Sequence, residues 1–446
     1  MTGLVNMMWT RDNRCFFLKL SLFFTIVLVR GFLWGALEVD VTEGTVVPNP
    51  FQIVFENQDA LSKDVANLLG EDLSSSGVFR RVGDVGTQTS FSRDALIRLQ
   101  GQSGAHFLVS LNVTSSRREC RVRVRMYDLL QMREISTFEV TAKKDQWRRC
   151  GHQIADRLYS HVTKTPGYFD TQIAYVAGLG QGGRRSFALG LMDSDGSNRR
   201  YLRRFNSLVK TPFYDVDNGR LFYIRNKTRD RMQIFELDLY WDQEYLLDVK
   251  GDVFSLRPVE GTKYLALAVR HRTSKSYARD HSSVGLLSVS SGRFSEIVAP
   301  APYIFISATG QALQQTIVFN SDHKGTPQLY ATGMSGGRLL RLSRESGRYY
   351  SPMCSKTSKK IAFMKRNANG FNIGVMSPNG RDEKIVATFY WAESPCWAPT
   401  GNALVFVASH SPRQAAQVYR LDMNSLKLHC IKTPDEAMEP FWARFK

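Results

Sequence analysis

The sequence has few cysteines, and they lack the spacing of metal-binding or redox sites. Six cysteines occur in 446 residues, with no CxxC pair and no Cys/His pattern typical of a zinc site. This low density excludes a small scaffold held together by disulfides, so hydrophobic cores must stabilise the fold. Five of the six follow residue 36, and the sequence does not indicate which of them pair.

Long hydrophobic runs are also scarce. The apolar run at residues 20–29 is shorter than the roughly 20 residues that a membrane span needs, and no later segment is long and apolar enough. A basic segment precedes this run and small residues near position 35 follow it, an order typical of a secretory signal peptide. We therefore predict a cleaved signal peptide in residues 1–36 and export of the mature chain. The alternative is an uncleaved anchor formed by residues 16–34.

Acidic residues are outnumbered by basic ones, 41 to 59, which gives a formal net charge of +18. These positive charges are either dispersed over a solvated surface, or they attract anionic envelope polymers and acidic partners. Arginine pairs such as Arg117–Arg118 and Arg199–Arg200 lack the interleaved aromatic residues of a groove for single-stranded nucleic acid. We therefore predict no nucleic-acid partner.

The length of the chain predicts two domains, because a single hydrophobic core rarely grows to 446 residues. Residues 37–165 alternate strand and helix patterns, and the apolar stripe of the first helix is closed by Gly77. The predicted helices are residues 60–76 and 146–162, and the predicted strands are residues 52–56, 107–113, 121–129 and 134–141. We expect an N-terminal α/β domain that ends at the Thr-Pro-Gly break of residues 165–167.

Helical periodicity almost vanishes after Gly167, and a repeat of short apolar strands replaces it. Six such strands begin at residues 173, 221, 265, 317, 361 and 404, spaced 43 to 52 residues apart. Each is followed by a second strand that runs into a turn, most of them glycine-containing. All-strand units of this length predict a β-propeller with four strands per blade, so we expect a six-bladed propeller over residues 166–446.

The chain end favours a closed ring over a solenoid. The second to sixth units open with a short element before their first apolar strand, but the first unit lacks it. Residues 439–443 (EPFWA) resemble the missing element and would supply the innermost strand of the first blade. Closure by the two ends of the chain removes open sheet edges, which favours solubility. A solenoid would not need such a complementary pair.

The junction between the two predicted domains carries the most specific motif. Trp147, His152 and Asp156 lie on the second predicted helix, and residues 167–176 (GYFDTQIAYV) follow it. This run resembles the TolB family, the periplasmic component of the Tol–Pal envelope system, and the likeness extends over almost the whole mature chain. The Ser-Pro-Asp-Gly turn of that family is present only in degenerate form, for example as residues 398–401 (APTG).

The resemblance implies a non-enzymatic periplasmic protein that supports outer-membrane integrity and envelope constriction during division, without a cofactor. It also implies two partners. A Pal-like peptidoglycan-associated lipoprotein is expected to dock on the propeller face formed by the loops before the inner strands. The positions expected there are Lys210, Lys250, Tyr303, Tyr350, Glu393 and Glu439.

The second implied partner is a TolA-like inner-membrane protein, which is expected to bind the N-terminal tail of the mature chain. The tail positions are Glu38, Val39, Asp40 and Val41. Their alternating pattern suits an extended segment that adds a strand to a partner sheet. The alternative is a strand within the chain's own α/β domain, and each of the propeller positions could equally belong to a solvated loop.

Two other functions remain open: a secreted propeller enzyme acting on peptides or glycans, and a charge-driven binder of envelope polymers. An enzyme needs carboxylates, histidines or metal ligands clustered at one end of several inner strands, and the sequence offers no such set. We therefore predict no catalytic, metal or cofactor residues. Residues 101–105 (GQSGA) resemble a nucleophile elbow, but we predict a loop there. Residues 178–183 are predicted to form a turn rather than a phosphate-binding loop. We interpret His152 as a structural histidine.

Overall fold

The structure is a computed structural model that describes residues 46–57, 59–180, 185–228, 231–272, 281–301, 305–311 and 315–444. The predicted signal peptide (residues 1–36) lies outside the described residues. So do five of the expected partner-binding positions, Glu38, Val39, Asp40, Val41 and Tyr303.

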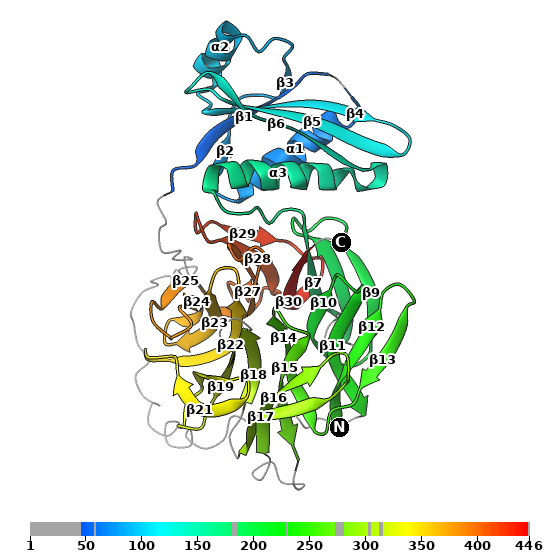
Figure 1. Cartoon of the computed structure of the whole chain (residues 1–446), viewed down its shortest axis with the longest axis vertical. Coiled ribbons are helices and arrows are strands. Elements are labelled where there is room, and N and C mark those ends of the chain that lie inside the picture. Colours follow the sequence, from blue (N-terminus) through cyan, green and yellow to red (C-terminus); the bar gives the residue numbers. More distant parts are fainter. Residues whose placement is uncertain are drawn as a thin grey trace, which may run out of the picture. The chain divides into compact units, whose positions relative to one another are not determined.

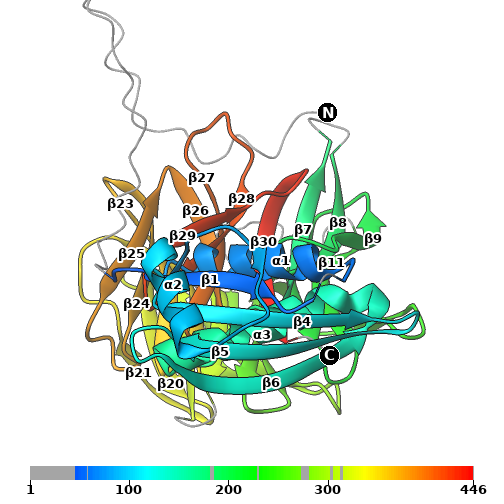
Figure 2. The ribbon, with the colours of Figure 1, turned by 90° about the horizontal axis from the view of Figure 1, so that it is seen from above.

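The N-terminal region is a mixed sheet with helices, as Figures 1 and 2 show. The strand order is β2-β1-β4-β5-β6, with β3 paired to β1; β1 is parallel to β2, β3 and β4, and the remaining pairs are antiparallel. The strands are β1 (Asn49–Phe55), β2 (Phe79–Arg81), β3 (Gly86–Thr87), β4 (Phe107–Ser115), β5 (Glu119–Asp128) and β6 (Arg133–Lys143). The helices are α1 (Ser62–Ser75), α2 (Arg93–Ser103) and α3 (Trp147–Thr163), with a 3₁₀ turn, η1 (Lys144–Gln146), before α3.

Helices α1 and α3 bury the apolar stripes that the sequence predicts. Val65, Leu69 and Leu73 of α1 recur every four residues and are buried together with Ile154 and Leu158 of α3. This spacing confirms both predicted helices to within two residues of their ends. The apolar face of each helix covers the sheet of the α/β region.

The helix α2 is a correction, because residues 101–105 were expected to form a loop. Ser92 caps its first turn by accepting a hydrogen bond from the Ala95 amide at 3.4 Å, and Gly104 ends it in the left-handed conformation with a φ of +66°. Gly101 and Ser103 therefore lie in the last turn of a helix. The strand-to-helix turn that a nucleophile elbow requires is not present at these residues.

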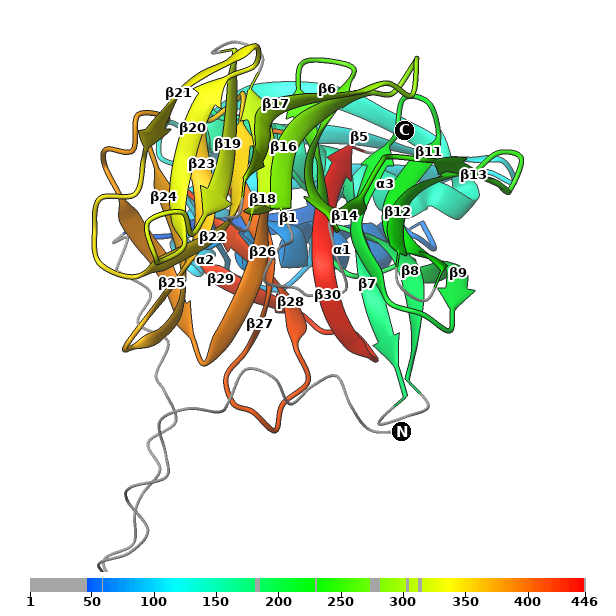
Figure 3. The same cartoon turned by 90° about the horizontal axis from the view of Figure 1, so that it is seen from below.

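The described part of the chain beyond α3 consists of strands, and it forms the predicted β-propeller (Figures 1 and 3). Four sheets contain four strands each, in the orders β30-β7-β8-β9, β10-β11-β12-β13, β22-β23-β24-β25 and β26-β27-β28-β29. Their strands are β7 (Thr171–Leu179), β8 (Ser186–Asp193), β9 (Arg200–Phe205), β10 (Val209–Asp215), β11 (Arg220–Thr228), β12 (Arg231–Asp238), β13 (Gln243–Leu247), β22 (Arg348–Ser355), β23 (Lys360–Asn367), β24 (Gly370–Met376), β25 (Lys384–Phe389), β26 (Trp391–Trp397), β27 (Ala403–Ser409), β28 (Gln417–Asp422), β29 (Leu428–Ile431) and β30 (Glu436–Arg444).

The prediction of six separate blades is corrected by the fifth sheet, which contains eight strands in the order β17-β16-β15-β14-β18-β19-β20-β21. These strands are β14 (Asp252–Glu260), β15 (Tyr264–His271), β16 (His281–Ser288), β17 (Phe294–Ala301), β18 (Phe305–Gln311), β19 (Thr316–Ser321), β20 (Gln328–Gly333) and β21 (Gly336–Arg341). A short parallel pairing joins β14 to β18, with Val259 opposite Gly310. A Cβ atom at Gly310 would lie 3.0 Å from the Val259 side chain, so glycine permits this close approach.

The C-terminal strand closes the ring, as predicted. In β30, Phe441 and Trp442 pair with Ala174 and Ile173 of β7. The Trp442 side chain is buried, and its indole nitrogen donates a hydrogen bond to the Thr171 hydroxyl at 2.7 Å. The two ends of the propeller sequence therefore share one sheet.

The described residues from Val46 onward belong to one compact unit. Apolar side chains of the α/β region and of the four four-stranded sheets form one continuous core cluster, to which Tyr159, Tyr168 and Trp442 contribute. Among the described residues, no helix combines the length and hydropathy that a membrane crossing requires.

Candidate functional site

The six inner strands of the propeller, β10, β14, β18, β22, β26 and β30, share a break in register. The breaks lie between Lys210 and Phe213, Val253 and Ser255, Phe305 and Ala308, Tyr350 and Met353, Glu393 and Cys396, and Met438 and Phe441. A β-bulge bends its strand and redirects the side chains beside it. Recurrence of the bulge at the same place in the inner strands makes it a feature of the propeller rather than a local defect.

Four of these bulges have the same chemistry. A non-glycine residue with positive φ stands directly before a proline, at Thr211 (+45°), Ser351 (+48°), Ser394 (+54°) and Glu439 (+48°). Proline has no backbone N–H, so it fits a position where the bulge leaves the ladder unpaired. The X-Pro pairs that the sequence shows at the start of several units are therefore the bulge residues.

The structure brings most of the expected propeller residues to these bulges. Lys210, Tyr350 and Glu393 each stand directly before the positive-φ residue, and all three are half-buried. Glu439 is itself the positive-φ residue of β30, one position further along. Lys250 is not at a bulge: it is an exposed residue two positions before β14, where the register break falls later, after Val253.

Side chains of four inner strands form a charged group, which we call the rim cluster: Lys210, Glu393 and Glu439 at the bulges, and Arg257 of β14. The Arg257 guanidinium lies 3.6 Å from the Glu439 carboxylate. Burial raises the pKa of Glu393 to about 7, and the Glu439 carboxylate adds to this rise while Lys210 and Arg257 oppose it. Sequence reasoning missed Arg257, because its contact with Glu439 joins two strands that lie far apart in the sequence.

A cavity of about 290 Å³ lies at the opposite ends of the inner strands. Its lining includes the aromatic residues Phe213, Trp397 and Trp442 and the carboxylates Asp215 and Glu260, and no histidine. Burial raises the pKa of Glu260, whose carboxylate accepts a hydrogen bond from the Lys356 amide.

The α/β region is held to the propeller by buried polar contacts at the last blade. The carboxylate of Asp422, at the end of β28, accepts hydrogen bonds from the hydroxyls of Tyr159 (2.6 Å) and Tyr168 (2.8 Å). The buried Arg420 guanidinium contacts the Ser194 carbonyl at 3.3 Å and the Ser75 hydroxyl. The contacts of Tyr159 with Asp422 and of Ser75 with Arg420 cross the junction, so they fix α3 and α1 against the turns of the propeller.

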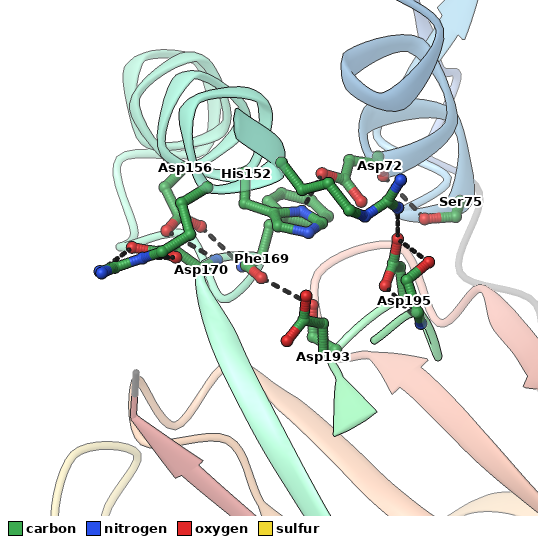
Figure 4. Close-up of polar contacts among 12 residues, drawn as sticks. Asp72, Ser75, His152, Asp156, Phe169, Asp170, Asp193 and Asp195 are labelled. Atoms are coloured by element: carbon green, nitrogen blue, oxygen red, sulfur yellow. Dashed lines mark hydrogen bonds and ion pairs between the residues drawn. The ribbon is translucent and has the colours of Figure 1, made fainter. Parts of the chain in front are cut away.

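The boundary motif has a structural explanation. The Asp156 carboxylate accepts hydrogen bonds from the amides of Phe169 (2.7 Å) and Asp170 (3.2 Å), which fixes the chain as it leaves α3 (Figure 4). A Cβ atom at Gly167 would lie 2.3 Å from the Asp156 Cα, so only glycine fits there. Burial raises the pKa of Asp156 to about 7, although the two amides favour its charged form.

His152, the other polar residue of the motif, is buried beside Asp72 of α1. Its Nδ1 lies 2.6 Å from the Asp72 carboxylate, which agrees with the structural role inferred from the sequence. Burial disfavours the charged ring, but the carboxylates of Asp72, Asp195 and Asp193 together outweigh it and raise the pKa of His152 to about 9. The other ring nitrogen, Nε2, has no hydrogen-bond partner among the described residues.

Comparison with known proteins covers both regions of the chain. Residues 37–135 match the model of the TolB amino-terminal domain, and residues 159–446 match that of the TolB beta propeller domain. The chain belongs to the TolB family. The resemblance inferred from the boundary motif is thus confirmed.

Individual relatives span nearly the whole chain. The Tol-Pal system protein TolB of Rickettsia bellii is 29% identical and the alignment covers 95% of this chain and 99% of the relative. The Tol-Pal system protein TolB of Gluconobacter oxydans is also 29% identical, over 92% of this chain and 89% of the relative. The crystal structure of TolB from Acinetobacter baumannii superposes with a TM-score of 0.74 at 19% identity, over 91% of this chain and 99% of that one. The last comparison supports the fold.

Proposed function

We propose that this chain is the non-enzymatic, periplasmic protein-binding component of a Tol–Pal system. In this role it is exported by a signal peptide in residues 1–36 and supports outer-membrane integrity and envelope constriction during division. The proposal divides the mature chain into an α/β domain (residues 37–165) and a propeller (residues 166–446), whose eight-stranded sheet counts as two of six blades. Membership of the TolB family across both regions supports it.

A Pal-like peptidoglycan-associated lipoprotein is the proposed partner of the propeller face that carries the rim cluster and Tyr350. The observation that carries this proposal is the common bulge, which places Lys210, Tyr350 and Glu393 at equivalent points of three inner strands. Half-buried charges of both signs with a tyrosine among them suit a protein surface better than a polyanion.

The described contacts of the last blade to the α/β region lie at the other ends of its strands. In the last blade, Glu393 stands near the start of β26, whereas Asn402, in the turn that follows the other end of β26, donates a hydrogen bond to the Pro166 carbonyl at 2.6 Å. Asp422 and Asp193, which lie near the α/β region, also end their strands on that side. The bulge ends of the inner strands therefore remain available to a partner.

A TolA-like inner-membrane protein is the proposed partner of the tail residues Glu38, Val39, Asp40 and Val41. The tail precedes β1 in the sequence, and an extended segment of alternating residues can pair with the edge of a partner sheet. Deletion of residues 37–41 should abolish binding of the TolA-like domain and leave binding of the Pal-like domain unchanged.

The test of the propeller face is a titration of the mature chain with the soluble domain of the Pal-like lipoprotein from the same organism. Lys210→Ala and Tyr350→Ala should each weaken binding about tenfold or more, as expected for residues near the centre of an interface. Tyr245→Ala, on the exposed outer strand β13, is the matched control and should bind like the parent chain. A parent chain that does not bind, or rim variants that bind as tightly as the control, would overturn the proposal.

A further inference from the structure

Three side chains at the junction of the α/β region and the propeller lie close enough together to ligate one metal ion. A ring nitrogen of His152 and one carboxylate oxygen each from Asp193 and Asp195 lie within 4.8 Å of one another. His152 comes from α3, and the two aspartates come from the end of β8 and the turn after it, as Figure 4 shows. We call these three residues the junction cluster.

The free ring nitrogen of His152 is the second observation that indicates a ligand. The His152 side chain is 2% exposed, and its Nε2 has no partner among the described residues. A buried polar atom without a hydrogen bond is energetically unfavourable, so such atoms in folded proteins call for an explanation. The Asp72 carboxylate, 2.6 Å from Nδ1, accepts the Nδ1 proton, so a cation that displaces the second ring proton meets the lone pair of Nε2 on the side of the ring away from Asp72.

This order of groups is that of a carboxylate–histidine–metal arrangement, in which a carboxylate behind the ring fixes the tautomer and orientation of the ligating histidine. The two aspartates are also held in place. The Asn198 amide donates to Asp193 at 2.6 Å, and the Ser197 amide donates to Asp195 at 2.9 Å. The ligand atoms are therefore oriented by partners outside the cluster.

The charges around the junction cluster are also unbalanced. Asp72, Asp193 and Asp195 contribute three negative charges, and Arg148, which forms an ion pair with Asp195, contributes one positive charge. When the His152 ring is neutral, these three aspartates and the arginine carry two net negative charges. A divalent cation neutralises them, whereas one proton on His152 neutralises only one.

We propose that His152, Asp193 and Asp195 bind a divalent first-row transition-metal ion of the Zn²⁺ or Mn²⁺ class. One imidazole and two carboxylates suit such ions. Because the ligands come from α3 and from the first blade of the propeller, the bound ion ties the α/β region to the propeller. Binding of the ion to the folded state alone stabilises that state by mass action.

The experiment uses the mature chain after exhaustive treatment with a chelator. Titration calorimetry with Zn²⁺ and with Mn²⁺ should show one site per chain, and the midpoint of thermal unfolding should rise with the concentration of the ion. Co²⁺ should give a d–d absorption spectrum, and crystals soaked in Zn²⁺ should show one anomalous peak between the three side chains.

Variants separate the ligands from their surroundings. Asp195→Asn and His152→Gln should lose at least about tenfold in affinity, and Asp72→Asn, which removes the support behind the ring, should lose about 10–100-fold. His161→Ala, on the same helix but outside the cluster, is the control and should bind like the parent chain. The anomalous peak and the Co²⁺ spectrum need only the parent chain, so they decide the case even if a variant fails to fold. No heat, no spectrum and no rise in the unfolding midpoint for the parent chain, or an anomalous peak elsewhere, would overturn the proposal.

Discussion

The junction between the α/β region and the propeller depends on Asp422, and replacing this residue gives a quantitative test. Its carboxylate is 1% exposed and accepts two hydrogen bonds from the hydroxyls of Tyr159 and Tyr168. It also accepts bonds from the amides of Asn424 and Ser425, both at 2.8 Å, which shape the turn after β28. Asp422→Ala removes the acceptor for both functions.

A matched residue in the second blade separates these functions. Asp238 ends β12 as Asp422 ends β28, and it accepts bonds from the Tyr240 (2.9 Å) and Trp241 (3.0 Å) amides without any contact from a buried tyrosine in the described structure. A hydrogen bond to a charged group contributes about 1.5–3 kcal/mol. The free energy of unfolding should therefore fall by roughly 3–6 kcal/mol more in Asp422→Ala than in Asp238→Ala, because only the first loses two such bonds.

Urea denaturation followed by tryptophan fluorescence measures both losses on the same chain. Tyr159→Phe combined with Asp422→Ala should cost less than the sum of the two single changes, because both remove the same bond. Equal losses for Asp422→Ala and Asp238→Ala, or additive losses in the double variant, would show that the tyrosine bonds do not hold the junction.

Three further outcomes follow from the described contacts. Trp442→Ala should lower the free energy of unfolding by about 3–5 kcal/mol, because this buried side chain closes the ring, and a loss below 1 kcal/mol in urea denaturation would contradict that role. Gly167→Ala should lower the unfolding midpoint because its Cβ meets the Asp156 backbone, whereas Gly101→Ala, which has open space in α2, should leave it unchanged or raise it; the reverse order would refute the packing argument. The raised pKa of Glu393 means that the folded chain binds more protons than the unfolded chain between its ordinary value of 4.5 and about 7, so this contribution to stability is complete below that window and is lost as pH rises through it. Glu393→Gln, which removes the carboxyl beside Glu436, Glu439, Lys210 and Arg257, should flatten the pH dependence of stability there, and an unchanged slope would refute the assignment.

The sequence predicts those elements whose burial is periodic. The stripes of α1 and α3 and the apolar strands of the propeller are buried on the faces that the spacing indicates, and the missing first element of the repeat indicates ring closure by β30. The helix α2 escapes prediction because only Ala95 and Leu96 are buried along it, so it has no apolar stripe. Its end signals, Ser92 and Gly104, were the only guide.

The site is less predictable because its residues meet across distant segments. The positions of Lys210, Tyr350 and Glu393 follow from the loops before the inner strands, but the contact of Arg257 with Glu439 joins two separate blades. The sequence does not indicate which residues lie beside His152, whereas the structure places it beside Asp193 and Asp195. No local sequence pattern predicts the contact of Arg257 with Glu439 or the proximity of His152 to the two aspartates.

The bulge ends of the inner strands are proposed to form the protein-binding face. Hydrogen exchange of the mature chain, measured with and without saturating Pal-like domain, locates that face. Added protection is expected at the beginnings of β10, β22 and β26, around Lys210, Tyr350 and Glu393, and none in the outer strands β13 and β21. Protection confined to the outer strands or to the turns that face the α/β region, or no protection at saturation, would contradict it.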